Sequence, residues 1–398
     1  MVAQPQQKPI LISGGGLSAL LLARSLLRSN IPFLVFERDA SISFRAQGYR
    51  LRLSNEGLDA VEAVLGPEGF AKFYDACGKT GGAGFAAVDP LTGENLGTEH
   101  STVRREGLSS RDGKVIGIAR GTMRSLFIEG CEEFVRWRHH VTGYELTDGG
   151  VRAIFADGSK SVEGSMLIGG EGIKSQVAKQ LSGGKLKVYD LGARGIHGQA
   201  STTAFKALGE GVFRAVDETS HPEGRVFLIT NVRAGDMDDP NVDFGWTIGG
   251  SAGVIKAPND DYTIIGKQAA DIARGLTKLW HPRVRSLIDN MRDDDAAFWK
   301  ITCSSPDGVP EWPNEPRVTV IGDAVHAMTP AGGNGANTAM RDSALLGRLL
   351  AEAGGFKEGV TAEYEKVMRV YASEAVKKSF STAEVSYSAV INESTATI

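Results

Sequence analysis

The stretch that most constrains the fold begins at Pro9, where the chain reads PILIS, then GGGLSALLLARSLLRSN, then IPFLVFERD. A strand, a glycine turn, a helix and a second strand in about thirty residues form a βαβ unit. The helix is apolar on nearly every side, so we expect it to be buried against a parallel sheet. Gly14, Gly16 and Ala19 fill the three positions of the G-x-G-x-x-G/A pattern, and Glu37 ends the second strand, where a carboxylate can hold ribose hydroxyls. The stretch therefore predicts dinucleotide binding; the alternative is a glycine turn that serves helix packing alone.

A second stretch, Val318 to Leu346, repeats the order strand, turn and helix near the other end of the chain. Its strand, VTVIG, ends at Asp323, a turn with Pro330 follows, and a glycine-rich run leads into the helix. Asp323 can accept hydrogen bonds from hydroxyls, while the start of the helix offers unpaired N–H groups and a partial positive charge. We therefore predict a site for a polyhydroxylated, electron-rich ligand; the alternative is an ordinary strand–turn–helix.

Composition restricts the class of protein. The chain has 398 residues, which favours two closely packed domains, and its hydrophobic (41%) and charged (23%) contents are those of a soluble globular protein. The net charge of −4, without a Lys/Arg-rich run, argues against a nucleic-acid partner. The three cysteines lack metal-ligand spacing, so we expect no metal site. The sequence has no signal-peptide pattern and no membrane-spanning run, and we expect a cytoplasmic protein.

Together, the two glycine-containing stretches resemble the FAD-dependent aromatic hydroxylases, which are single-component flavoprotein monooxygenases of the 4-hydroxybenzoate hydroxylase type. The resemblance covers most of the chain. It implies that the first stretch holds the ADP half of FAD and that Asp323 holds the ribityl and diphosphate region. It also implies that the run after Pro330 lies near the isoalloxazine ring, with Gly333, Gly335, Ala336 and Asn337 as its cofactor-binding residues.

Further positions between these stretches match the family. The segment ERDASISFRAQGYRLRLS, which begins at Glu37, contributes Arg38, Arg45 and Gly48 as cofactor-binding candidates. Arg45 matches the family arginine that reaches the FAD phosphates; the alternative is a solvent-exposed loop arginine. In the helical segment IARGTMRSLF, Arg120 matches a flavin contact, and Arg124, one turn later, is a weaker candidate.

One motif departs from the family pattern. Where the family has an Asp-Gly pair followed by Ser and Arg, this chain reads EGIKS from Glu171, and no arginine follows at the expected place. Glu171 is a cofactor-binding candidate that keeps the carboxylate on a side chain longer by one methylene, and Lys174 or Lys179 can supply positive charge. Because arginine and lysine differ at a bidentate phosphate site, the docking of NADPH or NADH stays open.

The middle of the chain is rich in strand patterns. Residues 135–167 read as a β-meander, and residues 185–299 as an antiparallel sheet. Phe244 and Trp246 share one face of the strand VDFGWTIGG, which makes them core residues or, if that face covers the flavin, the wall of a hydrophobic substrate pocket. Phe227 and His197 are weaker pocket candidates. After Gly355 the pattern is helical, and we expect the last eight residues to be disordered.

We therefore predict an α/β fold. It consists of a Rossmann-like FAD-binding domain (1–74, 103–184 and 300–355), an inserted antiparallel β-sheet substrate domain (75–102 and 185–299) and a C-terminal helical segment (356–398). The resemblance implies tightly but non-covalently bound FAD, which transient NADPH or NADH reduces. It further implies that O2 adds at flavin C4a and that the hydroperoxide hydroxylates or epoxidises a hydrophobic, aromatic or polycyclic, small molecule.

No catalytic base can be named from the sequence. One alternative is a flavoprotein reductase or dehydrogenase of the same fold that does not activate oxygen, which the altered motif at Glu171 leaves open. Another is a non-enzymatic dinucleotide-binding sensor. In each case we expect a monomer or a homodimer.

Overall fold

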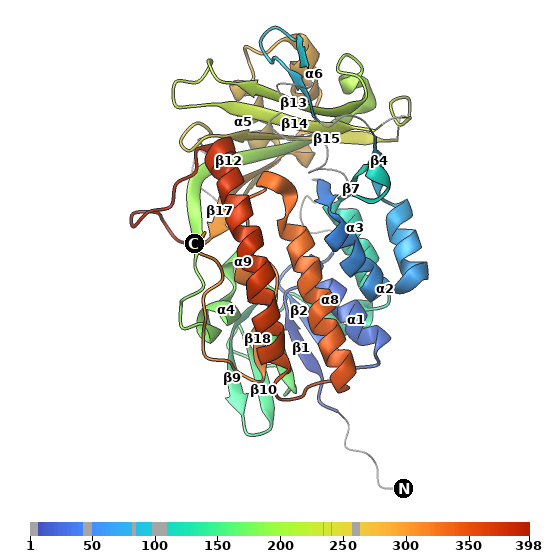
Figure 1. Ribbon diagram of the computed structural model, residues 1–398, viewed down its shortest axis with the longest axis vertical. Coiled ribbons are helices and arrows are strands. Elements are labelled where there is room, and N and C mark those ends of the chain that lie inside the picture. The colour runs from blue at the N-terminus through green and yellow to red at the C-terminus, as the bar shows by residue number, and fades with distance from the viewer. Residues whose placement is uncertain are drawn as a thin grey trace.

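A computed structural model describes residues 7–42, 50–81, 85–97, 110–233, 235–239, 241–256 and 263–398. The chain forms a parallel sheet in the lower half of Figure 1 and a larger, mainly antiparallel sheet in the upper half, with helices packed on both. The predicted α/β fold, with a Rossmann-like part, an inserted sheet and C-terminal helices, is confirmed.

The parallel sheet joins both glycine-containing stretches. Its five strands run in the order β18 (Val318–Val320), β11 (Met166–Gly169), β1 (Ile10–Ser13), β2 (Phe33–Glu37) and β8 (Val135–Trp137). β1, β11 and β18 are buried throughout, as is usual for parallel strands covered on both faces. Because all five strands are parallel, the turns after their carboxyl ends meet at one edge of the sheet.

Seven helices of the described part pack around this sheet or against each other. They are α1 (Leu17–Arg28), α2 (Asn55–Asp75), α3 (Arg120–Ile128), α4 (Gln176–Leu181), α7 (Asp323–His326), α8 (Gly335–Ala353) and α9 (Val360–Tyr387). α1 and α8 lie side by side, and glycine at Gly347 permits this approach because a Cβ there would overlap Ser25. None of the helices in the described ranges is long and apolar enough to cross a membrane.

The larger sheet has eight strands. Their order is β16 (Thr263–Ile265), β17 (Ala297–Ser304), β12 (Val188–Ser201), β15 (Asp243–Gly250), β14 (Val226–Val232), β13 (Gly211–Asp217), β5 (Phe85–Val88) and β6 (Asn95–Gly97). Neighbouring strands are antiparallel except β13 and β5, which are parallel. The sheet takes its strands from two separate parts of the chain, while the domain boundaries themselves stay a prediction.

The two faces of the larger sheet belong to different cores. The outer face packs against α5 (Lys267–Leu276) and α6 (Pro282–Asp289), as Figure 1 shows at the top. The inner face packs against the C-terminal half of α9 and against Ala331, which precedes α8. Because side chains alternate along a strand, each strand contributes to both cores.

Two small sheets complete the fold. β3 (Arg50–Leu53), β7 (Val115–Ala119) and β4 (Gly78–Thr80) form one, and β9 (Val141–Thr147) with β10 (Gly150–Phe155) forms a hairpin. The predicted β-meander over residues 135–167 is wrong in part, because β8 and β11 join the parallel sheet and leave only the hairpin. Short 3-10 turns connect the elements: η2 (Arg111–Gly113), η3 (Glu132–Phe134), η4 (Gly172–Lys174), η5 (Thr202–Phe205), η6 (Asp293–Asp295) and η7 (Ala331–Gly333).

The C-terminal tail is ordered, contrary to expectation. The amide of Ile398 donates a hydrogen bond to the carbonyl oxygen of Val188 (2.9 Å), and the amide of Asp190 donates to the carbonyl oxygen of Ala396 (2.8 Å). The tail therefore pairs with the beginning of β12, which explains why it does not detach from the body of the protein.

Candidate functional site

The turn between β1 and α1 lies very close to the turn that follows β11. Gly14 has a φ of +92°, and a Cβ there would lie 2.5 Å from the carbonyl oxygen of Gly170 and 2.9 Å from Cα of Glu171. Only glycine fits this backbone and this approach. At Gly16, in contrast, φ is −75° and the nearest atom to a Cβ would be 3.8 Å away. Ala19 is fully buried, and its Cβ would contact a Cβ at Gly170, so helix and strand are as close as the pattern predicts.

Glu37 at the end of β2 holds the same turn from the other side. Its Oε2 accepts a hydrogen bond from the amide of Gly15 (2.5 Å), and its Oε1 accepts one from the amide of Asp39 (2.9 Å). The guanidinium of Arg124, itself buried, lies 3.6 Å from Oε2, and its Nε donates to the carbonyl oxygen of Gly15 (2.9 Å). Arg124 is thus a positioning residue for the glycine turn. Arg38, between Glu37 and Asp39, is exposed.

Asp323 follows β18 at the same edge of the sheet. Asp323 is exposed, although neighbouring protein atoms displace part of the water around its carboxylate. This partial loss of solvent raises the pKa of Asp323, while the nearby charges of His326 and Arg120 oppose the shift. Arg120, the first residue of α3, is therefore close enough to Asp323 for its charge to lower the pKa of the carboxyl group. A ligand whose hydroxyl groups donate hydrogen bonds would satisfy this carboxylate.

Glu171, in the turn after β11, contributes a third carboxylate. Its Oε1 accepts a hydrogen bond from the amide of Val177 (3.0 Å). Within the described residues, Oε2 of Glu171 and the buried Oγ of Ser13 lack a well-aligned hydrogen bond, but the hydroxyls of Ser13 and Ser175 still stabilise the ionised carboxylate. Loss of solvent raises the pKa of Glu171, and the hydrogen bond from Val177 acts in the opposite direction. Ser13 and Glu171 can therefore partly satisfy each other, and the two oxygens alone do not indicate a missing ligand.

The start of α8 is built on the end of β3. Nδ2 of Asn337 donates to the carbonyl oxygens of Arg52 (2.9 Å) and Gly333 (2.8 Å), and its Oδ1 accepts from the amide of Ser54 (2.9 Å). The side chain of Asn337 is thus occupied within the protein, and only its backbone can serve a ligand. Arg52 adds a hydrogen bond to the carbonyl oxygen of Gly332 (2.9 Å).

The segment before α8 is open on one side. Pro330 is exposed and precedes η7, where Gly333 has a φ of +63°. Gly335 and Ala336 are half-buried, and within the described residues no side chain caps the first turn of α8. The same holds for α1. The two helices whose starts the sequence assigned to a ligand therefore both present uncapped N-termini at the site.

Three of the four predicted pocket residues occupy cores. Phe244 and Trp246 lie on the outer face of the sheet; Trp246 is 1% exposed, and its Nε1 donates to the carbonyl oxygen of Leu287 in α6 (2.9 Å). The condition for a pocket wall, that this face covers the flavin, is not met, and the alternative of core residues fits. Phe227 is on the inner face, but it packs on Tyr387 of α9, with ring centroids 5.3 Å apart.

His197, the fourth pocket candidate, lies on the inner face beside Gly245. A Cβ at Gly245 would lie 2.9 Å from its Cε1, so the imidazole covers a glycine of β15. Burial lowers the pKa of His197 to about 4, and a hydrogen bond with the backbone of Trp246 opposes the shift only partly. His197 is therefore neutral at pH 7.

Half-buried residues on the inner face, which the sequence did not single out, are better placed for a pocket. Thr247 is paired in register with His197 on one side and with Ile229 on the other. Trp299 and Met328 are partly exposed members of the same inner core, and Met328 Cβ lies 3.8 Å from the position of a Cβ at Gly335. The alternation rule could have found Thr247, because it is the neighbour of the predicted Trp246 and faces the opposite side.

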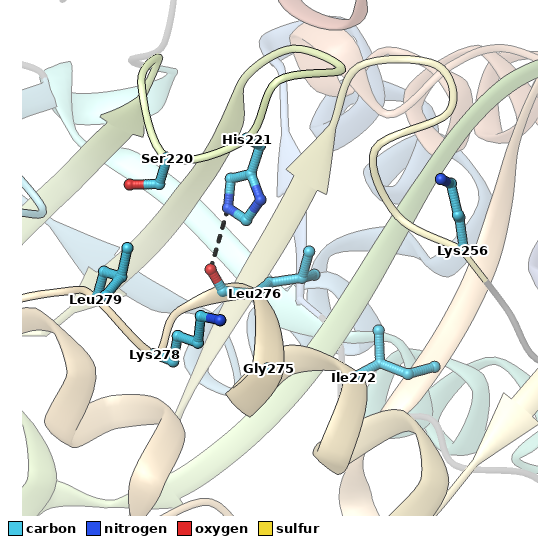
Figure 2. Close-up of a pocket in the computed structure, with 8 residues that line it drawn as sticks. All are labelled: Ser220, His221, Lys256, Ile272, Gly275, Leu276, Lys278 and Leu279. Carbon is cyan, nitrogen blue, oxygen red and sulfur yellow. Dashed lines mark hydrogen bonds between the residues drawn. The ribbon is translucent and has the colours of Figure 1, made fainter.

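A separate hollow of about 310 Å³ lies on the outer side of the sheet (Figure 2). His221 and Ser220 line it from the turn between β13 and β14, and Lys278 from the segment after α5; Nε2 of His221 is hydrogen-bonded to the carbonyl oxygen of Leu276 (3.1 Å). None of the predicted cofactor residues in the described part lines this hollow. Arg45 and Gly48 lie outside the described residues.

The residues present fit FAD. The close glycine turn with Glu37 suits an adenosine diphosphate, the carboxylate of Asp323 suits a ribityl chain, and the uncapped α8 suits the electron-rich edge of a flavin. Ser13 at the end of β1 and Glu171 in the turn after β11 lie between these groups and add polar atoms to the site.

Comparisons with known proteins agree. A family described as an FAD binding domain matches residues 128–379. A dual O-methyltransferase/FAD-dependent monooxygenase of Phaeosphaeria nodorum is 31% identical over an alignment of 389 residues, which covers 88% of this chain and 41% of that protein. An FAD-dependent monooxygenase of Aspergillus terreus is 25% identical over 373 residues, covering 88% of this chain and 91% of that protein.

Among solved structures, Klebsiella pneumoniae HpxO in complex with FAD and uric acid has the same fold. The TM-score is 0.73 at 20% sequence identity, covering 95% of this chain and 89% of that one. The chain spans less than half the length of the first curated relatives it matches, 41% of one and 45% of two. Because the family model matches more than half of the chain, the predicted resemblance is confirmed: the chain belongs to the FAD-binding-domain family of flavoproteins, with FAD as its cofactor.

Proposed function

We propose that the chain is an FAD-dependent monooxygenase that uses NADPH or NADH and O2 to hydroxylate or epoxidise a hydrophobic, aromatic or polycyclic, small molecule. For a hydroxylation, one substrate R–H, one O2, one NAD(P)H and one proton give R–OH, NAD(P)+ and water. The electrons of the hydride reduce one oxygen atom to water, and the other atom enters the substrate.

The observation that carries this proposal is the meeting of two remote segments at one edge of the parallel sheet. The turn after β1 and the turn after β18 lie on either side of the turn after β11. The turn after β1 begins α1, and the segment after β18 leads through α7 to α8. Neither α1 nor α8 has a side-chain cap in the described part, and the two segments have the carboxylates Glu37 and Asp323 beside them. A dinucleotide with an adenosine at one end and an electron-rich ring at the other needs two helix N-termini of this kind.

Individual residues have separate tasks in this proposal. Glu37 would accept hydrogen bonds from the adenosine ribose, and Asp323 from the ribityl hydroxyls. The backbone amides at the start of α8, from Gly335 to Asn337, would favour negative charge at the flavin ring. When bound, FAD supplies the hydride acceptance and the oxygen activation that no side chain can provide.

The inner face of the large sheet supplies the substrate chamber. Ile229, Thr247 and Trp299 present half-buried side chains there, opposite Met328, which precedes α8. Most of this surface is apolar, which suits a hydrophobic substrate. His197, neutral at pH 7, can hydrogen-bond a hydroxyl group without attracting a free anion.

The kind of reaction follows the relatives. The two curated relatives described above are named FAD-dependent monooxygenases, and one of them is named a dual O-methyltransferase as well. Hydroxylation of an aromatic ring gives a phenol, which is also a group that an O-methyltransferase can use. We place Glu171 and Lys174 at the docking site of the nicotinamide cofactor, where lysine takes the place of the family arginine.

The test measures NADPH oxidation and O2 uptake together. FAD-loaded protein is mixed with phenols, indoles, quinones and polyketide-like compounds, and the product is analysed after reaction under 18O2. We expect one compound class to accelerate both processes and to take up one labelled oxygen atom. If NADPH is oxidised and the substrate reduced without labelled oxygen, the protein is a flavoprotein reductase and the monooxygenase proposal is wrong.

A further inference from the structure

The carboxylate of Asp342, in the second turn of α8, is fully buried and accepts three hydrogen bonds from three parts of the chain. Its Oδ2 accepts from the amide of Gly322 (2.7 Å) and from Nε2 of His326 (2.6 Å). Its Oδ1 accepts from the hydroxyl of Tyr371 in α9 (2.6 Å). Asp342 and His326 are both 0% exposed, so the whole network is shielded from water.

The two oxygens of Asp342 serve different elements. Oδ2 holds the peptide immediately before Asp323 and the last residue of α7, so both ends of the short helix that Asp323 begins are attached to it. Oδ1 holds only α9, which lies on the other side of α8. One oxygen therefore controls the turn that carries Asp323, and the other contributes to helix packing.

The backbone conformation of Gly322 leaves the turn before Asp323 little room to move. Gly322 has a φ of +63°, and a Cβ there would lie 2.7 Å from Oγ of Ser18 in α1. The residue after Asp342, Ser343, is also fully buried and donates its hydroxyl to the carbonyl oxygen of Ser18 (2.8 Å). Two consecutive residues of α8 thus fix the turn before Asp323 and the first turn of α1 relative to each other.

The protonation state of His326 supports the arrangement. Burial disfavours the imidazolium, but the charge of Asp342 and the hydrogen bond to it outweigh burial, and the pKa of His326 is raised. Asp323 also faces this imidazole and raises its pKa, while Arg120 faces Asp323 from α3. The 2.6 Å distance from Nε2 to the carboxylate oxygen, which can only accept, places a hydrogen on Nε2 whether the ring is neutral or charged.

We propose that Asp342 is a positioning residue for the cofactor: it fixes the Gly322 amide and His326, and through them it aims Asp323 at FAD. The proposal rests on the proposed FAD site and goes beyond it, because Asp342 is buried and cannot itself touch the cofactor. It predicts that the shape of α7, rather than the stability of α8, sets the affinity for FAD.

The test compares two variants that each remove hydrogen bonds from the same carboxylate. In Asp342→Asn, the amide oxygen can replace Oδ2 with Nδ2 towards the Tyr371 hydroxyl, but the loss of the carboxylate charge weakens both hydrogen bonds at the turn. In Tyr371→Phe, only the hydrogen bond from α9 is lost, and Oδ2 keeps both of its partners. FAD affinity is measured by quenching of flavin fluorescence at a temperature well below both unfolding midpoints, and visible circular dichroism reports the environment of the bound flavin.

We expect Asp342→Asn to raise the Kd for FAD at least about tenfold and to change the flavin dichroism. Tyr371→Phe should lower the unfolding midpoint yet leave the Kd within about twofold and the dichroism unchanged. Equal Kd values in the two variants would show that Asp342 is merely structural. If Asp342→Asn does not fold, Asp342→Glu keeps the charge and displaces the carboxylate, and wild-type affinity in that variant would also overturn the proposal.

A third variant separates this proposal from the function on which it rests. Asp323→Ala removes the carboxylate that should contact FAD. If Asp323→Ala retains wild-type affinity for FAD, the proposed cofactor site is wrong. If it loses affinity while Asp342→Asn does not, the cofactor site stands and only the positioning role of Asp342 is wrong.

Discussion

The substitution Gly16→Ala should affect the affinity for FAD much more than the free energy of unfolding. A Cβ at Gly16 would meet no protein atom closer than 3.8 Å, and φ at this position is −75°, which alanine adopts readily. The family pattern nevertheless reserves this position for glycine, because a pyrophosphate approaches the backbone here. The fold alone therefore tolerates alanine, whereas the bound cofactor should not.

The two free energies can be worked out separately. Replacing glycine by alanine at a compatible φ stabilises a protein by about 0.4–1 kcal/mol, since the unfolded chain loses freedom. Gly16 is also the N-cap of α1, where alanine is poorer than glycine by about 1 kcal/mol. The free energy of unfolding should thus change by less than about 1 kcal/mol. A displaced diphosphate loses a charge-assisted hydrogen bond worth about 1.5–3 kcal/mol, which is about 10- to 100-fold in Kd.

Denaturant unfolding of the FAD-free protein and fluorescence titration with FAD measure these two quantities. Gly14→Ala is the matched control, since its φ of +92° and a Cβ at 2.5 Å from the Gly170 carbonyl oxygen should cost more than about 2 kcal/mol of folding free energy. The reasoning is refuted if Gly16→Ala binds FAD as tightly as the wild type, or if it destabilises the fold as much as Gly14→Ala does.

Two further predictions concern burial. Loss of solvent raises the pKa of Glu171, so the ionised carboxylate destabilises the folded, FAD-free protein. The stability that the protonated form gives is lost as pH rises above the ordinary pKa of about 4.3. Glu171→Gln should therefore gain unfolding free energy relative to the wild type as pH rises from about 4 to 8; a pH-independent difference in denaturant unfolding would contradict this. Trp246→Ala should lower the unfolding free energy by about 3–5 kcal/mol, because Trp246 is a core residue; a stable variant with altered substrate selectivity would return the residue to the pocket.

Local sequence patterns predicted the site's backbone well. Glu37 at the end of β2 accepts a hydrogen bond from Gly15 in the turn after β1, and Asp323 follows β18, as the strand–glycine–helix patterns indicated. Such patterns are reliable because a left-handed turn and a close backbone approach both require glycine, and because parallel strands bring their carboxyl ends to one edge. The contacts of these residues with FAD stay a prediction.

Long-range packing could not be predicted in the same way. Strand alternation placed Phe244 and Trp246 on one face correctly, but which face α6 covers depends on a segment some forty residues later that has no local mark in the strand. The same limit applies to β8 and β11, which look like members of a meander but pair in parallel with β2 and β1. For β11, the continuous apolar run MLIG was the available signal.

The buried contacts of α8 explain how two segments at opposite ends of the chain can serve one ligand. Asp342 binds the Gly322 amide, and Ser343 binds the Ser18 carbonyl oxygen, so one rigid helix sets the distance between the turn after β18 and the start of α1. These bonds form within the protein and do not need the cofactor. If FAD binds as proposed, it meets a site whose geometry folding has already set, which lowers the entropic cost of binding. In that proposal, the buried carboxylate of Asp342 acts on the affinity for FAD through the turn before Asp323, without touching the cofactor.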